Sequence, residues 1–432
     1  DNLITLHQRK CISFTGRAGR LISTVNKKRI TSSWEQRKFG EVFDCTVPNN
    51  TLSRAELSYD EGTVLNVHYG DVLIKYGSVL DVQKDDIPRI PHRCREDFNG
   101  ALLQDGDVII ADTAEDETTG KACEIGNLQG SAIVSGLHTM VCRPRNRMAL
   151  GYLGYYLNSN AYHYQLLPLM QGIKVLSLSR SNIQKTSVSY PIAVKEQQLI
   201  AYYFRQLDNL ITLHQRKFEK LTNVKKSMLE KMFPQNGSSY PEIRFKGFTD
   251  PWEQRKLGDI GKARSGVGFP DADQGGLTGV PFFKVSDMNS DGNENEMTVA
   301  NNYVTAEQIA DHRWSPITEL PAIFFAKVGA AVMLNRKRLC RFPFLLDNNT
   351  MAYSLSPTKW DADFAKALFG TVDLTSLVQV GALPSYNAGD VESMEIYLPS
   401  LLEQEQIGAY FNHLDNLITL HQRQPIVYAV IH

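Results

Sequence analysis

Basic side chains gather in two short phrases of this 432-residue chain, and their spacing suggests contact with phosphate groups. The phrase RPRNR places Arg143, Arg145 and Arg147 at alternate positions, so on a β-strand all three would point to one face. Such a row can hold the phosphates of a nucleic acid, and a solvated strand end is the alternative. The phrase NRKRLCR ends a segment, residues 313–341, that holds a single acid, Glu319. Its candidate DNA contacts are Lys327, Arg336, Lys337, Arg338 and Arg341, with a plain basic loop as the alternative.

The composition limits what these residues can do. The chain has 46 basic and 47 acidic side chains, so no overall field draws in nucleic acid and any contact must be local. With 42% hydrophobic residues, two or three domains can form cores. The six cysteines are scattered, which favours reduced thiols in a cytoplasmic protein, with no metal site, no secretion signal and no membrane span. No phosphate-binding glycine loop and no methyltransferase motif is present, so we expect no cofactor in this chain.

A repeated phrase indicates the elements that position these groups. LDNLITLHQR occurs at residues 207–216 and 414–423, and the chain begins with DNLITLHQR. Around the second copy, residues 195–233 contain no Pro or Gly and place apolar residues at alternating steps of three and four, which predicts a helix of about 58 Å that packs along one narrow stripe. We expect the third copy to continue the same stripe and its helix to stop near Pro425. The predicted seam residues are Ile200, Phe204, Leu207, Ile211, His214, Phe218 and Leu221, and then Ile407, Phe411, Leu414 and Ile418.

Two further landmarks divide the chain into equivalent halves. WEQRK begins at Trp34 and again at Trp252, and each half closes on a phrase with Pro and Glu-Gln. Short β-type runs are predicted at 70–78, 105–113 and 135–143, and at 280–287, 321–329 and 349–356, each set followed by a helical stretch, 153–167 or 361–372. The predicted organisation is a helical region 1–33, a domain 34–194, a spacer helix 195–235, a linker and second domain 236–402, and a final helix 403–432.

The order of these elements resembles the specificity subunit of type I restriction–modification systems. The likeness rests on WEQRKLGDI, GDVLI and GDVII, on SGLHTMVCRP and DNNTMAYSLSP, and on residues 172–200 running into the long helix. It implies an α+β fold in which two similar target-recognition domains, related by a pseudo-twofold axis, are separated by long antiparallel coiled-coil helices. It also implies that each domain reads one half of a bipartite DNA site and that the chain itself is not catalytic. Half-sites about one helical turn apart or somewhat more would suit the spacer length.

The resemblance also implies partners. Two modification subunits would dock on the helices and supply methyl transfer with S-adenosylmethionine, and two restriction subunits would add cleavage with ATP and Mg²⁺. The termini depart from the family pattern, since both fall inside the repeated phrase, which we interpret as truncation, circular permutation or recombination.

Two polar loops become candidate DNA contacts through the same resemblance. Their candidate residues are Lys174, Ser177, Ser179 and Arg180 in one loop, and Ser385, Tyr386 and Asn387 in the other. Arg and Asn can each make two hydrogen bonds to one base, whereas the alternative is a turn with capping side chains. For His214 and His421, a polar contact that fixes helix register is favoured over a metal site. The alternative functions are a helical scaffold without DNA recognition and a self-contained DNA nuclease.

Overall fold

Residues 34–235, 237–378 and 383–429 are described by the computed structural model, with side chains as far as Gln422. The chain divides into two compact units, and the division between residues 209 and 210 falls inside helix α8 (Val194–Lys231). We call the part before the division unit 1 and the part after it unit 2. The predicted helical region 1–33, with the first copy of the repeated phrase, lies outside the described residues.

A five-stranded sheet forms the centre of unit 1. Its order is β2 (Phe43–Asp44), β10 (Thr139–Pro144), β6 (Val108–Ala111), β8 (Ala122–Gly126) and β4 (Val79–Asp81). Every residue of β6 and β8 is buried, as expected for apolar runs in the middle of a sheet. A second sheet of β5 (Arg89–Ile90), β3 (Val64–Val67) and β9 (Ala132–Ser135) lies beside it, and β11 (Leu176–Ser177) pairs with β7 (Thr113–Ala114).

Short helices cover the sheets of unit 1. They are α3 (Phe39–Val42), α4 (Tyr69–Ile74), α5 (Tyr152–Asn158), α6 (Asn160–His163) and α7 (Arg180–Ile183). Helix α5 contributes Tyr152 and Leu153 to a core that also holds Val108 and Ala122 of the sheet. The predicted helical stretch 153–167 is therefore confirmed, and its apolar face packs on the sheet.

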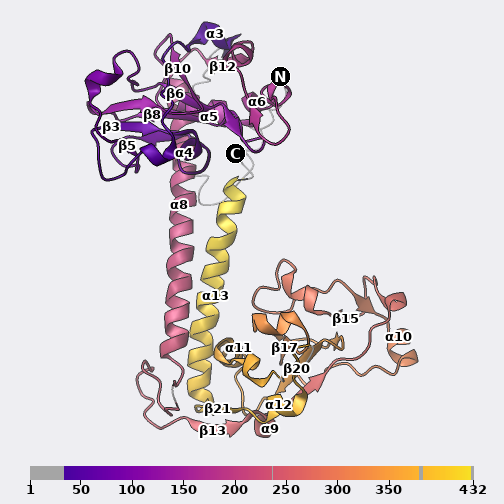
Figure 1. Ribbon diagram of the computed structural model, residues 1–432. Helices are drawn as coiled ribbons and strands as arrows, with labels where there is room; N and C mark the ends of the chain where they lie inside the picture. The colour runs from indigo at the N-terminus through magenta and orange to yellow at the C-terminus, as the bar shows by residue number, and fades with distance from the viewer. Residues whose placement is uncertain (1–33, 236, 379–382, 430–432) are drawn as a thin grey trace, which may run out of the picture. The chain divides into compact units, whose positions relative to one another are not determined.

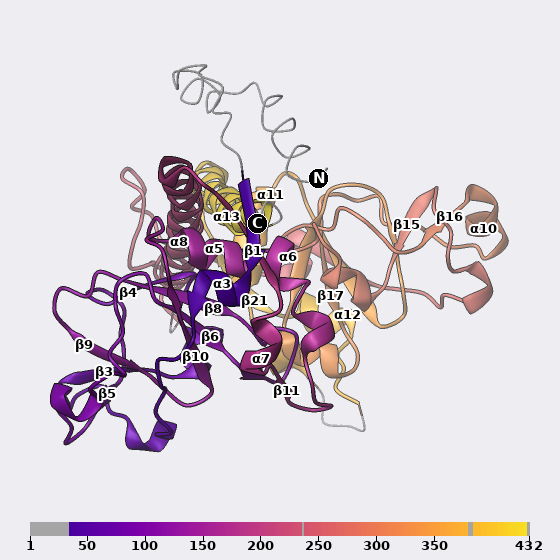
Figure 2. The same cartoon turned by 90° about the horizontal axis from the view of Figure 1, so that it is seen from above.

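Unit 2 repeats the strand order of unit 1. A four-stranded sheet runs β14 (Gly261–Ser265), β20 (Thr350–Leu355), β17 (Ala322–Ala326) and β18 (Lys337–Cys340), matching β2, β10, β6 and β8. A three-stranded sheet of β16 (Tyr303–Val304), β15 (Val280–Phe283) and β19 (Leu345–Leu346) matches β5, β3 and β9, since in each sheet one pair is antiparallel and the other parallel. Figure 2 shows this second sheet beside α10 (Ala306–Asp311). The remaining short helices are α9 (Leu257–Ile260), α11 (Ala362–Thr371) and α12 (Ala388–Glu392). The prediction of two similar α+β domains is confirmed.

A two-stranded ribbon joins the beginning and end of each domain. In unit 1, β1 (Trp34–Lys38) pairs with β12 (Ser187–Pro191), and in unit 2, β13 (Glu253–Lys256) pairs with β21 (Glu395–Leu398). The repeated WEQRK phrase is thus the first strand of each ribbon, and the Pro-containing phrase is the second. This pairing explains why the same two landmarks mark both halves of the sequence.

Helices α8 and α13 (Leu401–Ala429) run antiparallel within unit 2 (Figure 1). His214 of α8 meets His421 of α13, whereas Lys225, further along α8, meets Asp415, earlier in α13. The opposite order of these two contacts establishes the antiparallel direction, as predicted. Between residues 211 and 223 the only positions that are not exposed are Ile211, His214, Phe218 and Leu221, the spacing of a coiled-coil stripe.

Two sequence-based expectations about elements are wrong. The run GDVLI was expected to be a strand, but it belongs to helix α4, which begins where the His68 ring accepts a hydrogen bond from Gly70 N–H at 3.2 Å. A short apolar run suits either element, and this unusual cap decides it. Helix α13 does not stop near Pro425 but continues to Ala429. A proline deletes one backbone hydrogen bond and bends a helix, and it does not have to end a helix that is already long.

Candidate nucleic-acid interface

The same hydrogen bonds attach each domain to a long helix. Trp34 Nε1 donates to Glu196 at 3.1 Å in unit 1, and Trp252 Nε1 donates to Glu403 at 3.3 Å in unit 2. Glu403 also accepts hydrogen bonds from Nε and Nη2 of Arg244, at 2.7 and 2.8 Å. These carboxylates occupy equivalent places in the Glu-Gln phrases, so the repeated letters encode one attachment used twice.

The glutamine after each of these acids completes the attachment. Gln197 accepts from Ala149 N–H at 2.9 Å and donates to Pro191 at 2.8 Å. Gln404 accepts from Asp361 N–H at 3.0 Å and donates to Pro399 at 3.0 Å. Both side chains are buried, and each connects the closing ribbon to the backbone just before α5 or α11. The two phrases are visible in the sequence, but their role in this attachment is visible only in the fold.

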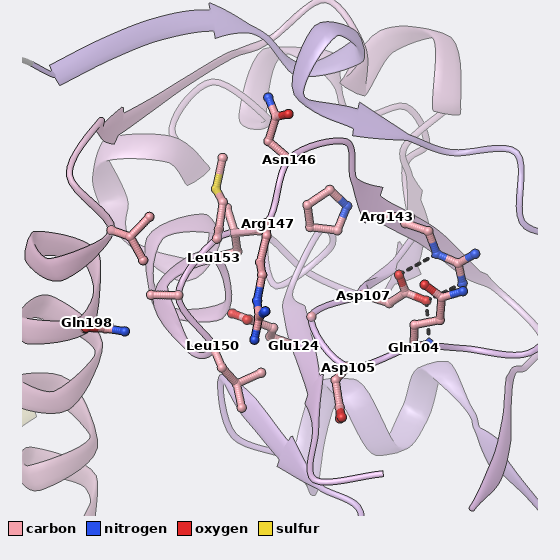
Figure 3. A pocket seen from close by; sticks show the side chains of 15 residues that line it. Gln104, Asp105, Asp107, Glu124, Arg143, Asn146, Arg147, Leu150, Leu153 and Gln198 are labelled. Carbon is pink, nitrogen blue, oxygen red and sulfur yellow. Dashed lines mark hydrogen bonds and ion pairs between the residues drawn. The ribbon is translucent and has the colours of Figure 1, made fainter. Parts of the chain in front are cut away.

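A cavity of about 870 Å³ in unit 1 brings together two of the arginines of RPRNR (Figure 3). Arg143 lies on β10 and forms a two-armed ion pair with the buried Asp107, at 2.7 and 2.8 Å, which raises its pKa. Arg147 points into the cavity with its side chain exposed. Strand β10 ends at Pro144, so the expected alternation of three arginines along one strand is wrong, and Arg145 lies exposed beyond it. Arg143 is largely used within the domain, whereas Arg145 and Arg147 are exposed.

Glu124 lines this cavity and holds the start of α5. Its carboxylate accepts from Gly151 N–H at 2.9 Å and Gly154 N–H at 2.8 Å. Burial raises the pKa of Glu124 to about 7, although the backbone N–H groups oppose that shift. Position 154 has no room for a side chain, because a Cβ there would meet the Ser78 carbonyl oxygen at 2.0 Å and the Glu124 Cβ at 3.1 Å. We infer that Glu124 shapes the cavity by fixing α5.

The loop that carries Lys174, Ser177, Ser179 and Arg180 precedes α7. Ser179 caps this helix by accepting from Asn182 N–H at 3.2 Å, and Ser177 donates to Gln171 at 3.3 Å. Lys174 and Arg180 are exposed. The hydroxyl groups therefore fit the alternative reading of capping side chains, whereas the two cations are accessible to a ligand.

The basic phrase of unit 2 is more strongly bound into its domain than the sequence suggested. Arg338 donates through Nε to the Asn293 carbonyl at 2.6 Å, and burial lowers the pKa of Lys337 to about 8. Arg341 pairs with Glu296 at 3.0 Å and with Asp363 at 2.5 Å. Burial also lowers the pKa of Lys327, which is only partly exposed. Lys337 and Arg338 lie on β18 and line a cavity, Arg341 directly follows this strand, and Lys327 directly follows β17, so these residues do not form an open loop.

The equivalent loop of unit 2 ends at α12. Asn387 caps this helix by accepting from Asp390 N–H at 3.1 Å, in the position that Ser179 has before α7. Asn387 is exposed and Ser385 is partly exposed. Tyr386 is 5% exposed and donates its hydroxyl to the Ala326 carbonyl at 2.6 Å, so its ring belongs to the core and we leave it out of the DNA contacts proposed below.

The remaining predicted seam residues lie along the long helices as the repeat implied. Leu207, Ile407, Phe411 and Leu414 are buried, and Ile200, Phe204 and Ile418 are partly exposed. His214 and His421 place their Nδ1 atoms 2.8 Å apart, so one ring donates and the other accepts. Burial, followed by the charges of His214 and Lys217, lowers the pKa of His421.

Two kinds of feature are absent from the described part of the chain. None of its helices is long and apolar enough to cross a membrane. Among the residues with described side chains, no three His, Cys, Asp or Glu come together as a metal site.

Comparison with known proteins identifies the family. A chain of Methanocaldococcus jannaschii, named as the specificity subunit of the type I restriction enzyme MjaX, is 22% identical over 422 residues, which cover 91% of this chain and 90% of the relative. The crystal structure of a type I restriction–modification S subunit from M. genitalium matches with a TM-score of 0.55 at 12% identity, covering 94% of this chain and 96% of that one. A chain from a structural study of complex assembly and conformational transition of the type I restriction–modification system matches with a TM-score of 0.52 at 16% identity, covering 92% and 94%. These two likenesses establish the shared fold. The model of the type I restriction modification DNA specificity domain matches residues 31–223 and 249–427, and the chain therefore belongs to this family of type I specificity subunits.

Proposed function

We propose that unit 1 and unit 2 each read one half of a bipartite DNA site, and that the chain does so without catalysis of its own. The observation that carries this proposal is the repetition within the chain. Both units have the same strand order, the same ribbon and the same attachment to a long helix, and in both an exposed polar loop ends at a capped short helix. Two copies of one scaffold with different loops suit the reading of two different half-sites.

The structure narrows the DNA contacts that we propose. In unit 1 they are Arg145, Arg147, Lys174 and Arg180, which are exposed cations on two loops. In unit 2 the exposed Asn387 and the partly exposed Ser385 are the candidates for base or phosphate contact. Arg143, Lys337, Arg338 and Arg341 already have partners within their domains, so their replacement would disturb folding as well as binding.

The long helices are the proposed docking surface for two modification subunits. Leu213 and Leu420 hold equivalent places in the two copies of the repeated phrase, and their side chains are 47% and 50% exposed. Folding alone does not require similar side chains at exposed positions, whereas docking of two identical partners favours similar surfaces at the two places. S-adenosylmethionine, and in a cleaving complex ATP and Mg²⁺, would belong to the modification and restriction subunits. Such a complex would act in the cytoplasm.

The test uses the chain assembled with its modification subunit and duplexes in which one half-site is scrambled. Arg180→Gln should reduce affinity for duplexes that retain the unit 1 half-site and leave those that retain only the unit 2 half-site unchanged. Asn387→Ala should give the opposite pattern, by about 1–3 kcal/mol if it contacts a base edge. Equal losses on both duplexes would contradict the assignment of one half-site to each unit. Protection of no DNA would favour a scaffold, and cutting by the chain alone with Mg²⁺ would favour a nuclease.

A further inference from the structure

A second cavity, of about 290 Å³, lies in unit 2 and is lined mainly by positive side chains. Five cations face it: Arg336, Lys337 and Arg338 from β18 and the residue before it, Lys225 from α8, and Lys366 from α11. The acids in its lining are Glu294 and Asp415. We call this cavity the β18 pocket.

Two of the five cations, Lys225 and Lys366, form ion pairs with the same acid of the pocket. Asp415 of α13 accepts from Lys225 at 2.5 Å and lies 3.4 Å from Lys366. Lys366 also contacts Glu296 at 3.3 Å. This network connects α11 to both long helices of unit 2. The positive charge that remains in the pocket therefore comes from β18.

Arg336, Lys337 and Arg338 have only neutral hydrogen-bond acceptors among the described residues. Arg336 donates to the Asn289 side chain at 2.6 Å, Lys337 donates to the Val372 carbonyl, and Arg338 donates to the carbonyls of Asn293 and Lys337. Among the described residues, none of the three lies within 4.0 Å of a carboxylate oxygen. Neutral acceptors satisfy N–H groups but do not offset a charge that has left water.

The electrostatics of these side chains agree with an incomplete counter-charge. Burial lowers the pKa of Lys337 to about 8, and burial followed by the charge of Arg336 lowers the pKa of Arg338, although the charges of Asp373 and Glu294 oppose these two shifts. Arg336 Nε is buried without an acceptor in the described part of the chain. Buried N–H groups almost always have a partner, so this one indicates a site that a ligand completes.

We propose that the β18 pocket binds a single phosphate group, held by Arg336 and Arg338 with Lys337 beside it. Guanidinium groups match the oxygens of a tetrahedral dianion, and two arginines with a lysine supply the charge for it. The volume is at the small end of ligand cavities, which suits one phosphate group better than an extended ligand. The phosphate comes either from the backbone of bound DNA or from a small free molecule. Binding would hold β18 against the helices that carry Lys225 and Asp415.

The first test is titration of the purified full-length chain, without DNA, with inorganic phosphate at constant ionic strength set by chloride. We expect saturable binding and a rise in the melting temperature of unit 2 by about 5–10 °C at a hundredfold excess over the Kd. Arg336→Gln should weaken binding at least tenfold, and Arg336→Lys should weaken it less. The control is Arg255→Gln, an exposed arginine on the unit 2 ribbon whose ion-pair partner is Glu253, which should leave binding unchanged.

The outcomes decide between occupants and against the proposal. No saturable binding, or equal binding by Arg336→Gln, would overturn it, as would binding of acetate or an acidic peptide in preference to phosphate, which would indicate a protein partner. If the phosphate belongs to DNA, Arg336→Gln in the assembled complex should lower the slope of log affinity against log salt by about 0.9. If the ligand is free, the slope should not change. The titration involves no DNA, so its result is separate from that of the half-site experiment.

Discussion

The attachment of each domain to its long helix can be tested by one change made at two equivalent positions. Glu403→Gln and Glu196→Gln both replace a carboxylate by an amide, and both keep an oxygen that can accept from the tryptophan Nε1. The surroundings differ. The Glu403 side chain is 1% exposed and bound to both arms of Arg244, itself 15% exposed, whereas no arginine is paired with Glu196 among the described residues.

The expected magnitudes follow from that difference. Removing one partner of a buried ion pair leaves an uncompensated charge and costs about 3–5 kcal/mol. Weakening a single hydrogen bond that is not part of such a pair costs about 0.5–1.5 kcal/mol. Glu403→Gln should therefore destabilise unit 2 by at least about 1.5 kcal/mol more than Glu196→Gln destabilises unit 1.

Hydrogen exchange read peptide by peptide is the suitable assay, because a chain of two units does not unfold in a single two-state transition. Glu403→Gln should speed exchange in β13, β21 and the first turns of α13 by roughly two to four orders of magnitude, and leave β6 and β8 unchanged. Glu196→Gln should speed exchange in β1 and β12 by about tenfold or less. Similar effects of the two substitutions would refute the inference that the Arg244 pair dominates the attachment in unit 2.

Three further predictions concern the helices and the buried acid of unit 1. Phe411→Ala, which empties a fully buried position of α13, should cost unit 2 about 3–5 kcal/mol, whereas Leu420→Ala at a half-exposed position should change its stability by less than about 0.5 kcal/mol in denaturant titrations. Because the pKa of His421 is lowered in the folded chain, unit 2 should keep its full stability above about pH 6.5 and lose stability as the pH falls below that value, and His421→Leu should abolish this dependence in melts between pH 5 and 8. The pKa of Glu124 is raised to about 7, so unit 1 should be most stable below about pH 4.5 with respect to this group and lose about 3 kcal/mol as the pH rises through 7. Glu124→Gln should flatten that part of the profile, and an unchanged slope would contradict the shifted pKa.

The long helices and the two domains could be predicted because their signals are local or repeated. Apolar residues at steps of three and four specify the shielded stripe from Ile211 to Leu221, and the copied phrases specify the ribbons. Residues 70–74 could not be assigned to helix or strand from the sequence, because the hydrogen bond that caps the helix comes from the His68 ring. The functional sites were harder to predict than the elements. The β18 pocket, for example, brings together Lys225 of α8, Arg336 just before β18 and Lys366 of α11, which are far apart in the sequence. Only the folded chain shows that Tyr386 is part of the core and that Asn387 is not.

The meeting of His214 with His421 has a consequence for how such a chain can change. The two histidines occupy the same position of the identical phrases at residues 207–216 and 414–423, so the two copies of the phrase contact each other at equivalent residues. A segment cut out between two such phrases and replaced by another would restore the same junction, whatever sequence it brought. The contact between the two helices would then stay the same whichever domain is present. Whole domains could therefore be exchanged, and a half-site preference changed with them, without further substitutions at the junction.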